Sequence, residues 1–410
     1  MSYRFEAHIV SFRPMAKFGH EMRTHWSLDP DVIYLNHGTV GAPPRCVLEV
    51  QQKLRDEIER QPSRFLLREL AGVGLGAERS KTPRLRAAAD EVARFLGAEG
   101  KDLVFVDNAT SGINAVLRAF KFNEGDEVVV LNQVYGAVRN AAEYATGVCG
   151  AKVRVIELPE PVISPDSVVR CIQDSIGPRT RLALIDHIVS DSGLVLPIAE
   201  IASQCKERDV AVLVDGAHAP GAIELDISSL GVDWYAGNLH KWAWSPRSSG
   251  ILWTAPSRQA ELHHPVVSWG FGQGISEEFD WPGTRDPTPH LAAPAGIAFM
   301  RELGVRNVQG YNHRLAWEAG CEMAARWDSN PLAPEEMIGS MITVPLPERL
   351  GSSREDAMRI RDALLFGHNI EAHVHAWKGR IRVRVSAQVY NELSDIECLI
   401  RAMEVIARAR

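Results

Sequence analysis

Cysteine is scarce in this sequence and is not arranged for cross-linking or metal binding. The 410 residues include six cysteines, scattered without a CxxC pair or another paired spacing. A disulfide framework and a zinc site are therefore disfavoured, and we predict no metal. Without the cysteine pattern of a secreted domain, the expected compartment is the cytoplasm.

An excess of positive charge and long apolar runs are also missing. Lysine and arginine number 45 against 52 aspartates and glutamates, and the net charge of −7 implies no basic surface for nucleic acid. No apolar run approaches the length that crosses a bilayer, and the first residues lack the apolar core of a signal peptide. With 45% hydrophobic and 24% charged residues, the composition is typical of a globular protein, and the length fits two domains.

The middle of the chain alternates short apolar runs with helical patterns. Strands are predicted over residues 102–106, 127–131, 152–158, 181–188, 210–215 and 250–254, and helices over 111–120, 137–145 and 196–208. Continuous apolar strands between helices are typical of a mostly parallel sheet that helices cover on both faces. Ligands bind such sheets beyond the carboxyl ends of the strands.

The character of the sequence changes near residue 301, where a smaller α+β domain is expected. One face of the predicted strand "RIRVRVS" carries Ile381, Val383 and Val385, and the other carries Arg382, Arg384 and Ser386. We therefore predict a large α/β domain over residues 71–300 and the smaller domain over 301–410. An N-terminal segment, residues 1–70, is expected to pack on the small domain and the active site.

Polar and small residues follow several of the predicted strands. In "VFVDNATSGIN" the backbone N–H groups of Ala109 and Thr110 would point outward at the start of a helix, which suits a phosphate. The alternative is an ordinary helix cap by Thr110 or Asn108. Tyr135 follows the strand "EVVVLN" and could lie flat over a ring, although a partly buried core tyrosine is the simpler reading.

Asp215 and Lys241 are expected at neighbouring strand ends. Asp215 ends a buried strand, where a carboxylate either caps its own turn or holds a protonated ring nitrogen. Lys241 follows 26 residues later (241 − 215), with one strand between, so both can reach one crevice. A lysine there can lose its proton and form an imine, whereas most lysines are simply solvated. A phosphate cradle, an aromatic ring, an acid and a lysine in this order describe a pyridoxal-phosphate site.

The sequence resembles the class V aminotransferase family, and within it the isopenicillin N epimerase-like branch. The segments that carry the resemblance are "SLDPDVIYLNHGTVGAPP", "DNATSGIN", "DGAHAPG", "GNLHKW", "WPGTRDPTP" and "RVRVSAQVYN". The resemblance implies the fold-type I architecture: a mostly parallel seven-stranded sheet between helices, with a smaller C-terminal α+β domain. It also implies pyridoxal 5′-phosphate as cofactor.

The resemblance further implies roles for individual residues. Lys241 would form the Schiff base and act as the proton-transfer base, and Asp215 would pair with the pyridine nitrogen. Tyr135 takes the ring-stacking position, where many members of the family have histidine. The other cofactor contacts would come from Ala109 and Thr110 (phosphate, through the backbone), Asn238 and His240 (side chains), and Ser190 and His218 (near the ring hydroxyl). Thr284 would contact the phosphate of a neighbouring subunit, which makes the expected assembly a homodimer with shared sites.

An arginine is expected to bind the α-carboxylate of the substrate. Arg384 matches the family arginine that binds this carboxylate. Its chemistry suits the role, because a planar, permanently charged guanidinium binds a carboxylate at two points. A strand-face salt bridge is the alternative role, and Arg382 on the same face is the rival residue. Asn36 and His37, in "LNHG", would line the substrate side, although structural caps there are nearly as plausible.

The region before Arg384 contains no cysteine. Cysteine desulfurases of this family need a nucleophilic cysteine there, so that activity is disfavoured. The stretch does contain His373 and His375 on one face of a strand, where exposed or structural histidines are the simpler reading.

The sequence leaves several reactions on an amino acid or its conjugate open. Epimerisation at Cα needs a second acid opposite Lys241, for which Tyr135 and His37 are candidates. Elimination of a β-substituent, as in a Cβ–S lyase, needs one base and help for the leaving group. Transamination, decarboxylation and a non-catalytic cofactor-binding role are the remaining alternatives.

Overall fold

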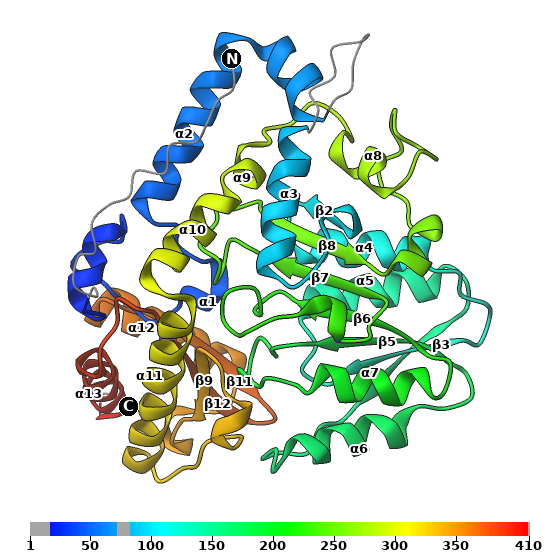
Figure 1. The fold of residues 1–410 in the computed structure, drawn as a ribbon. Helices are drawn as coiled ribbons and strands as arrows, with labels where there is room; N and C mark the ends of the chain where they lie inside the picture. The colour runs from blue at the N-terminus through cyan, green and yellow to red at the C-terminus, as the bar shows by residue number, and fades with distance from the viewer. Residues whose placement is uncertain (1–16, 72–82, 409–410) are drawn as a thin grey trace.

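A computed structural model describes residues 17–71 and 83–408, and its centre is a seven-stranded sheet (Figure 1). The strand order is β2 (Leu103–Val106), β8 (Gly250–Thr254), β7 (Trp234–Asn238), β6 (Ala211–Gly216), β5 (Thr180–Asp186), β3 (Glu127–Leu131) and β4 (Lys152–Ile156). Strand β8 is antiparallel to both of its neighbours, and the other pairings are parallel. The predicted mostly parallel seven-stranded sheet is confirmed.

Helices cover both faces of this sheet, which explains why most of its strands are apolar along their length, whereas the edge strand β4 carries the exposed Lys152 and Arg154. Alternate residues of β3 enter opposite cores: Val128 and Val130 enter one, and Val129 and Leu131 enter the other. Helices α4 (Ala109–Ala119) and α5 (Gly136–Gly147) contribute to the first core, and α3 (Arg84–Phe95), α6 (Pro165–Ser175) and α7 (Ile198–Lys206) contribute to the second. A strand buried on both sides reads as a continuous apolar run.

A second, antiparallel sheet lies beside the large one, in the orange part of Figure 1. Its strand order is β11 (His373–Trp377), β12 (Arg380–Ser386) and β9 (Met341–Pro345). Helices α11 (Val305–Arg326) and α12 (Arg354–His368) pack on it, and α13 (Leu393–Arg408) packs on these two helices. This arrangement confirms the expected C-terminal α+β part.

The N-terminal segment packs against the C-terminal sheet region. Strand β1 (Ile33–Tyr34) pairs in parallel with β10 (Ile370–Glu371), and Trp26 contacts Tyr390 edge to face. The remaining helices are α1 (His37–Val40), α2 (Arg45–Arg60), α8 (Ile275–Asp280), α9 (Thr288–Leu291) and α10 (Ala293–Leu303). The expected domain limits at residues 70 and 300 stay predictions.

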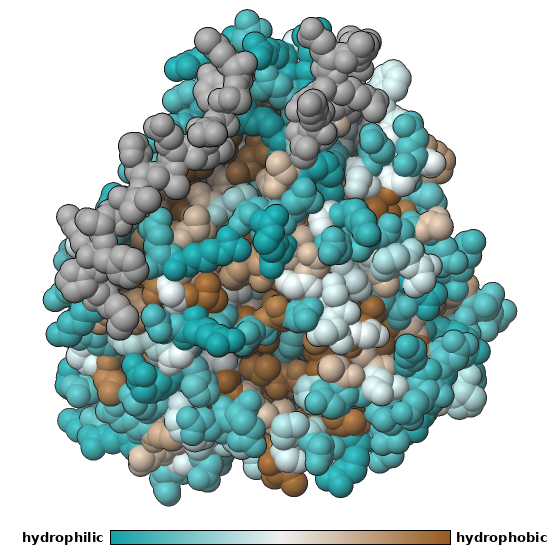
Figure 2. Space-filling model, viewed as in Figure 1, coloured by the Kyte–Doolittle hydropathy of each residue, from teal (hydrophilic) through white to brown (hydrophobic). Residues whose placement is uncertain are grey.

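The visible surface is mostly hydrophilic, with apolar residues in scattered places (Figure 2). Within residues 17–71 and 83–408, no helix is both long enough and apolar enough to cross a membrane.

Candidate active site

A cavity of about 440 Å³ opens at the carboxyl ends of β5, β6 and β7, beside the start of α4. Its lining is formed by Thr39, Asn108, Ala109, Thr110, Ser111, Tyr135, Asp186, Ile188, Ser190, Asp215, Ala217, His218, Asn238, His240 and Lys241. Nine of the residues chosen from the sequence therefore meet in one place, which is the edge of a parallel sheet where ligands bind.

Lys241 follows the end of β7 and lines this cavity. Its Nζ lies 3.0 Å from Nε2 of His218. Burial of the amine, together with the charge of Arg384, lowers the pKa of Lys241 to about 7, against the opposing effect of Asp215. A large fraction of the amine is therefore uncharged near neutral pH, as a nucleophilic lysine requires.

His218 supports the uncharged form of that lysine. Trp242 Nε1, which can only donate, lies 3.4 Å from His218 Nδ1. Burial, followed by the charge of Lys241, holds the pKa of His218 well below its usual value, so the ring is neutral. With Nδ1 accepting, the ring proton sits on Nε2 and donates to the lone pair of the Lys241 amine.

Two buried carboxylates lie side by side at the strand ends. Asp215 on β6 and Asp186 on β5 are register partners, and both line the cavity. Oδ1 of Asp215 accepts the N–H of Ala217 at 3.0 Å, whereas Oδ2 of Asp186 is buried with no partner among the described residues. Burial raises the pKa of Asp215. Burial and the neighbouring charge of Asp215 together raise the pKa of Asp186 well above its usual value. Sequence reasoning missed Asp186, although it ends the apolar strand run "LALID" much as Asp215 ends its own.

The raised pKa of Asp186 predicts a pH-dependent effect of Asp186→Asn. The folded protein keeps the Asp186 proton to higher pH than the unfolded chain, so this residue's contribution to stability falls as pH rises above about 4. The asparagine variant cannot ionise. We expect its free energy of unfolding in urea to match the parent near pH 4 and to exceed it increasingly toward neutral pH. A difference in the free energy of unfolding between Asp186→Asn and the parent that does not change with pH would contradict this interpretation. So would a difference equal to that of the exposed control Asp31→Asn.

The start of α4 offers one free N–H group where two were expected. Asn108 caps the helix by accepting the N–H of Ser111 at 2.9 Å. The N–H of Ala109 donates to Oδ1 of Asn238 at 2.8 Å, so it is not free for a phosphate, and the contact uses only the oxygen of the Asn238 side chain. Within the described residues, the N–H of Thr110 has no partner, and Thr110 lines the cavity at the positive end of the helix.

Arg384 is buried, and its guanidinium contacts only neutral acceptors. Nη1 donates to the carbonyl of Ser190 at 2.6 Å, and Nη2 donates to Oγ1 of Thr39 at 2.8 Å and Oδ1 of Asn36 at 3.2 Å. Burial lowers the pKa of Arg384 to about 10. Arg382, by contrast, is ion-paired with Glu160. Among the described residues Arg384 has no carboxylate in contact with it. Of the two arginines, Arg384 is therefore the one available to bind the carboxylate of a ligand.

His37 and Asn36 position other groups and do not line the cavity. His37 is fully buried, with Nδ1 2.8 Å from the hydroxyl of Tyr390 and Nε2 2.8 Å from the carbonyl oxygen of Lys241. Both ring nitrogens are occupied, so His37 cannot serve as the second acid considered from the sequence. Asn36 holds Arg384 and donates from Nδ2 to Glu371 at 2.8 Å.

The remaining residues differ in exposure. Tyr135 lines the cavity and is half exposed, which fits a ring-covering position better than a core tyrosine. His240 lines the cavity with Nδ1 3.1 Å from the carbonyl of Ser249, and burial lowers its pKa to about 4. Thr284 is exposed between α8 and α9 and does not line the cavity of its own chain. Its role in a second subunit stays a prediction.

Gly41 lies against the backbone that carries the lysine. Its φ is +68°, and an added Cβ would overlap the carbonyl oxygen of His240 and lie 3.0 Å from Cα of Lys241. We expect Gly41→Ala to lower the free energy of unfolding by roughly 2–5 kcal/mol, from left-handed strain plus overpacking, and to lower activity by displacing Lys241. The matched control is Gly125→Ala, whose φ is +84° with nothing within 4 Å. Equal losses in urea unfolding would show that strain alone is responsible.

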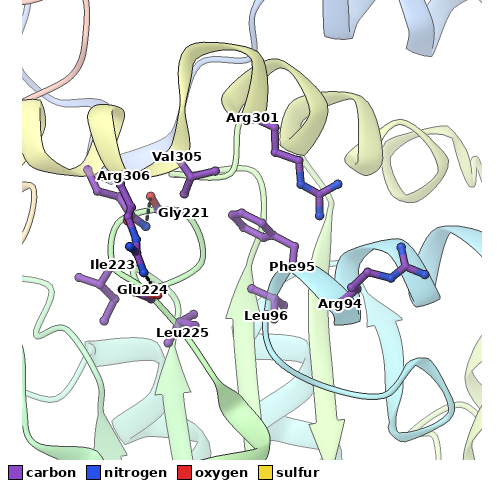
Figure 3. A pocket seen from close by; sticks show the side chains of 11 residues that line it. Arg94, Phe95, Leu96, Gly221, Ile223, Glu224, Leu225, Arg301, Val305 and Arg306 are labelled. Atoms are coloured by element: carbon purple, nitrogen blue, oxygen red, sulfur yellow. Dashed lines mark hydrogen bonds and ion pairs between the residues drawn. The ribbon is translucent and has the colours of Figure 1, made fainter. Parts of the chain in front are cut away.

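A second cavity, of about 270 Å³, lacks these chemical groups (Figure 3). It is lined in part by Arg94, Arg301 and Arg306, and these arginines are paired with Glu91 or Glu224. Its described lining holds no lysine, histidine or aspartate, so it does not compete with the cavity around Lys241.

Comparison with known proteins places the chain in a family. The class V aminotransferase family model matches residues 73–399, so the chain belongs to this family. A probable chloroplastic L-cysteine desulfhydrase of Arabidopsis thaliana is 34% identical over 409 residues, covering 93% of this chain and 84% of that protein. Isopenicillin N epimerase of Streptomyces clavuligerus is 31% identical over 404 residues, covering 94% and 98%. The fold matches apo cysteine desulfurase from Thermococcus onnurineus NA1 with a TM-score of 0.77 and 19% identity, over 98% and 100% of the two chains.

Proposed function

We propose that this protein is a pyridoxal-phosphate-dependent enzyme that removes the α-proton of an amino acid and eliminates a sulfur substituent from its β-carbon. The observation that carries the substrate class is Arg384, whose buried guanidinium has only neutral partners beside the cavity of Lys241. The charge of Asp191 acts on Arg384 without direct contact. A buried cation with no carboxylate in contact is costly, and the α-carboxylate of an amino acid would relieve that cost.

The residues around the cavity fit the cofactor. Lys241 offers an amine with a pKa of about 7 for the Schiff base, and Asp215 offers a buried carboxylate for a protonated ring nitrogen. The free N–H of Thr110 at the start of α4 suits the phosphate, and Tyr135 suits the ring face. Once bound, the cofactor supplies an electron sink for negative charge at the α-carbon.

The protein's own groups then divide the work between binding and proton transfer. Arg384 fixes the carboxylate and so orients the Cα–H bond. The amine of Lys241 takes the α-proton, and His218 Nε2, 3.0 Å away, keeps that amine in place.

Elimination is favoured over epimerisation because one base is sufficient for it. Both ring nitrogens of His37 are engaged, which leaves Tyr135 as the candidate acid for the opposite face. The similarity to an L-cysteine desulfhydrase supports elimination. Epimerisation is the second candidate, supported by the half-exposed Tyr135 in the cavity and by the similarity to isopenicillin N epimerase.

A persulfide-forming desulfurase reaction is not part of this proposal. A cysteine desulfurase shares the fold, but none of the six cysteines lines the cavity of this chain. The homodimer with shared sites and the cytoplasmic location are further proposals that rest on the sequence.

Proton NMR in deuterated water tests the proposed reaction. The cofactor-loaded protein is incubated with L-amino acids and cysteine S-conjugates. Pyruvate, ammonia and a released thiol would support elimination. Loss of the α-proton signal from an otherwise intact amino acid, followed by chiral analysis, would support epimerisation and overturn the lyase proposal.

A further inference from the structure

Two histidines and an aspartate form a cluster that the reaction as described so far does not use. His373 and His375 alternate along β11, and Asp191 lies in the loop after β5. Ligand-type atoms of the three residues lie within 4.8 Å of one another. His373 Nε2 is 3.6 Å from Asp191 Oδ1, and the imidazole rings stack with centroids 5.1 Å apart.

The cluster adjoins the place assigned to the α-carboxylate. His373 is the direct cross-strand partner of Arg384, so the two side chains share a face of the sheet. Asp191 follows Ser190, whose carbonyl holds the Arg384 guanidinium. Burial is the main cause of the low pKa of His218, and the charge of His373 is one of the smaller contributions. His373 therefore lies within electrostatic reach of the group that contacts Lys241.

Most of the hydrogen-bonding capacity of the two imidazoles is unused among the described residues. Nε2 of His373 and both ring nitrogens of His375 are buried without a hydrogen-bond partner among the described residues. Buried polar atoms in folded proteins nearly always have a partner. Burial raises the pKa of Asp191, but its contact with His373 and the charges of both histidines and Arg384 outweigh burial and lower the pKa below its usual value. The cluster thus combines a carboxylate, one imidazole at ion-pair distance from it and a second imidazole without a hydrogen-bond partner among the described residues.

A substrate group fits these atoms better than a metal ion does. Two histidines and a carboxylate are also a metal-ligand set. However, the guanidinium groups of Arg382 and Arg384 lie on the same sheet face, and both act on His375. Their positive charges oppose a divalent cation and favour an electron-rich group.

We infer that Asp191, His373 and His375 form the subsite for the β-substituent of the substrate, and that His373 gives its proton to the departing sulfur. This inference rests on the proposed lyase function. As the Cβ–S bond breaks, its electron pair leaves with sulfur, and the imidazolium proton of His373 converts the thiolate to a thiol. Asp191 Oδ1, 3.6 Å from His373 Nε2, faces the imidazole that gives the proton, and solvent restores the proton afterwards. The substrate class is cysteine or a cysteine derivative whose sulfur needs protonation on leaving.

A pair of small substrates tests the inference, because only one of them needs the acid. The chloride of β-chloro-L-alanine leaves without protonation, whereas the thiolate of L-cysteine does not leave readily without it. We expect His373→Gln to lower pyruvate formation from L-cysteine by about 100-fold or more and that from β-chloro-L-alanine by less than about threefold. Asp191→Asn, which keeps both imidazoles, is expected to show the same selectivity with a smaller loss. His368→Gln, on α12, is the matched control and should behave like the parent.

Each other outcome has a defined meaning. Equal losses with both substrates would overturn the inference, as would a parent enzyme that acts on β-chloro-L-alanine but not on L-cysteine. A stoichiometric metal found by mass spectrometry in the parent and lost in His375→Gln would also overturn it, because the imidazoles would then be ligands. A parent enzyme that eliminates from neither substrate contradicts the proposed function itself. Melting temperature and borohydride labelling of Lys241 check that each variant is folded and loaded.

Discussion

Replacing Lys241 by alanine is expected to abolish α-proton removal, with a loss of roughly 10²–10⁴-fold from the missing base alone. The reason is that this lysine lines the cavity and has a pKa of about 7, so a large fraction of its amine is uncharged and able to accept a proton near neutral pH. The measurement is the exchange of the α-proton in deuterated water, followed by NMR. A further loss is expected because the Schiff base to the cofactor is no longer formed.

Borohydride reduction tests the Schiff-base role of this lysine separately from its role as a base. Peptide mapping of the reduced parent should place the pyridoxyl group on Lys241 and nowhere else. The control Lys206→Ala removes a lysine at the end of α7 and should keep both the label and the activity. A pyridoxyl group on any other lysine would refute the assignment of Lys241.

Replacing Arg384 by alanine should weaken substrate binding by roughly 2–5 kcal/mol, or about 30- to 5,000-fold in affinity. The guanidinium is buried and its hydrogen-bond acceptors are all neutral. The carboxylate of the substrate would therefore be the first anion in direct contact with it. Arg382→Ala is the matched control, because that arginine lies on the same strand face but is already paired with Glu160. It should leave affinity for the amino acid nearly unchanged.

A ligand without a carboxylate makes this experiment specific. We expect 2-aminoethanethiol to bind the parent and Arg384→Ala with similar affinity, because it presents nothing to the guanidinium. An unchanged affinity for the amino acid itself, or an equal loss for both ligands, would remove Arg384 from carboxylate recognition.

The sheet was predictable from the sequence because most of its strands are apolar on both sides and alternate with helices. Element limits were less accurate. The helix predicted from residue 111 begins at Ala109, because the Asn108 side chain caps it and small residues around the junction carry no periodicity. The predicted strands over 152–158 and 181–188 end earlier, at Ile156 and Asp186, because apolar residues beyond those points belong to loops that also face the core.

The site was predictable where the relevant residues follow strand ends and unpredictable where the partner is remote. Lys241, Asp215 and Tyr135 were found in this way. The choice between Arg382 and Arg384 could not be made from a strand pattern that treats them alike. It depends on Glu160, 222 residues from Arg382 in the sequence. The engagement of His37 likewise depends on Tyr390, 353 residues away.

The clamp around Arg384 has a consequence for how the protein is made. The guanidinium is held by Asn36 and Thr39 from the start of the described chain and by Ser190 from the large sheet, while Arg384 itself lies on β12. Because these segments lie far apart in the sequence, they are synthesised at different times. The large sheet and its lysine can fold first, but the substrate side of the cavity closes only after β12 has been synthesised. The proposed recognition of an amino acid by Arg384 therefore requires that the chain has been made at least as far as β12.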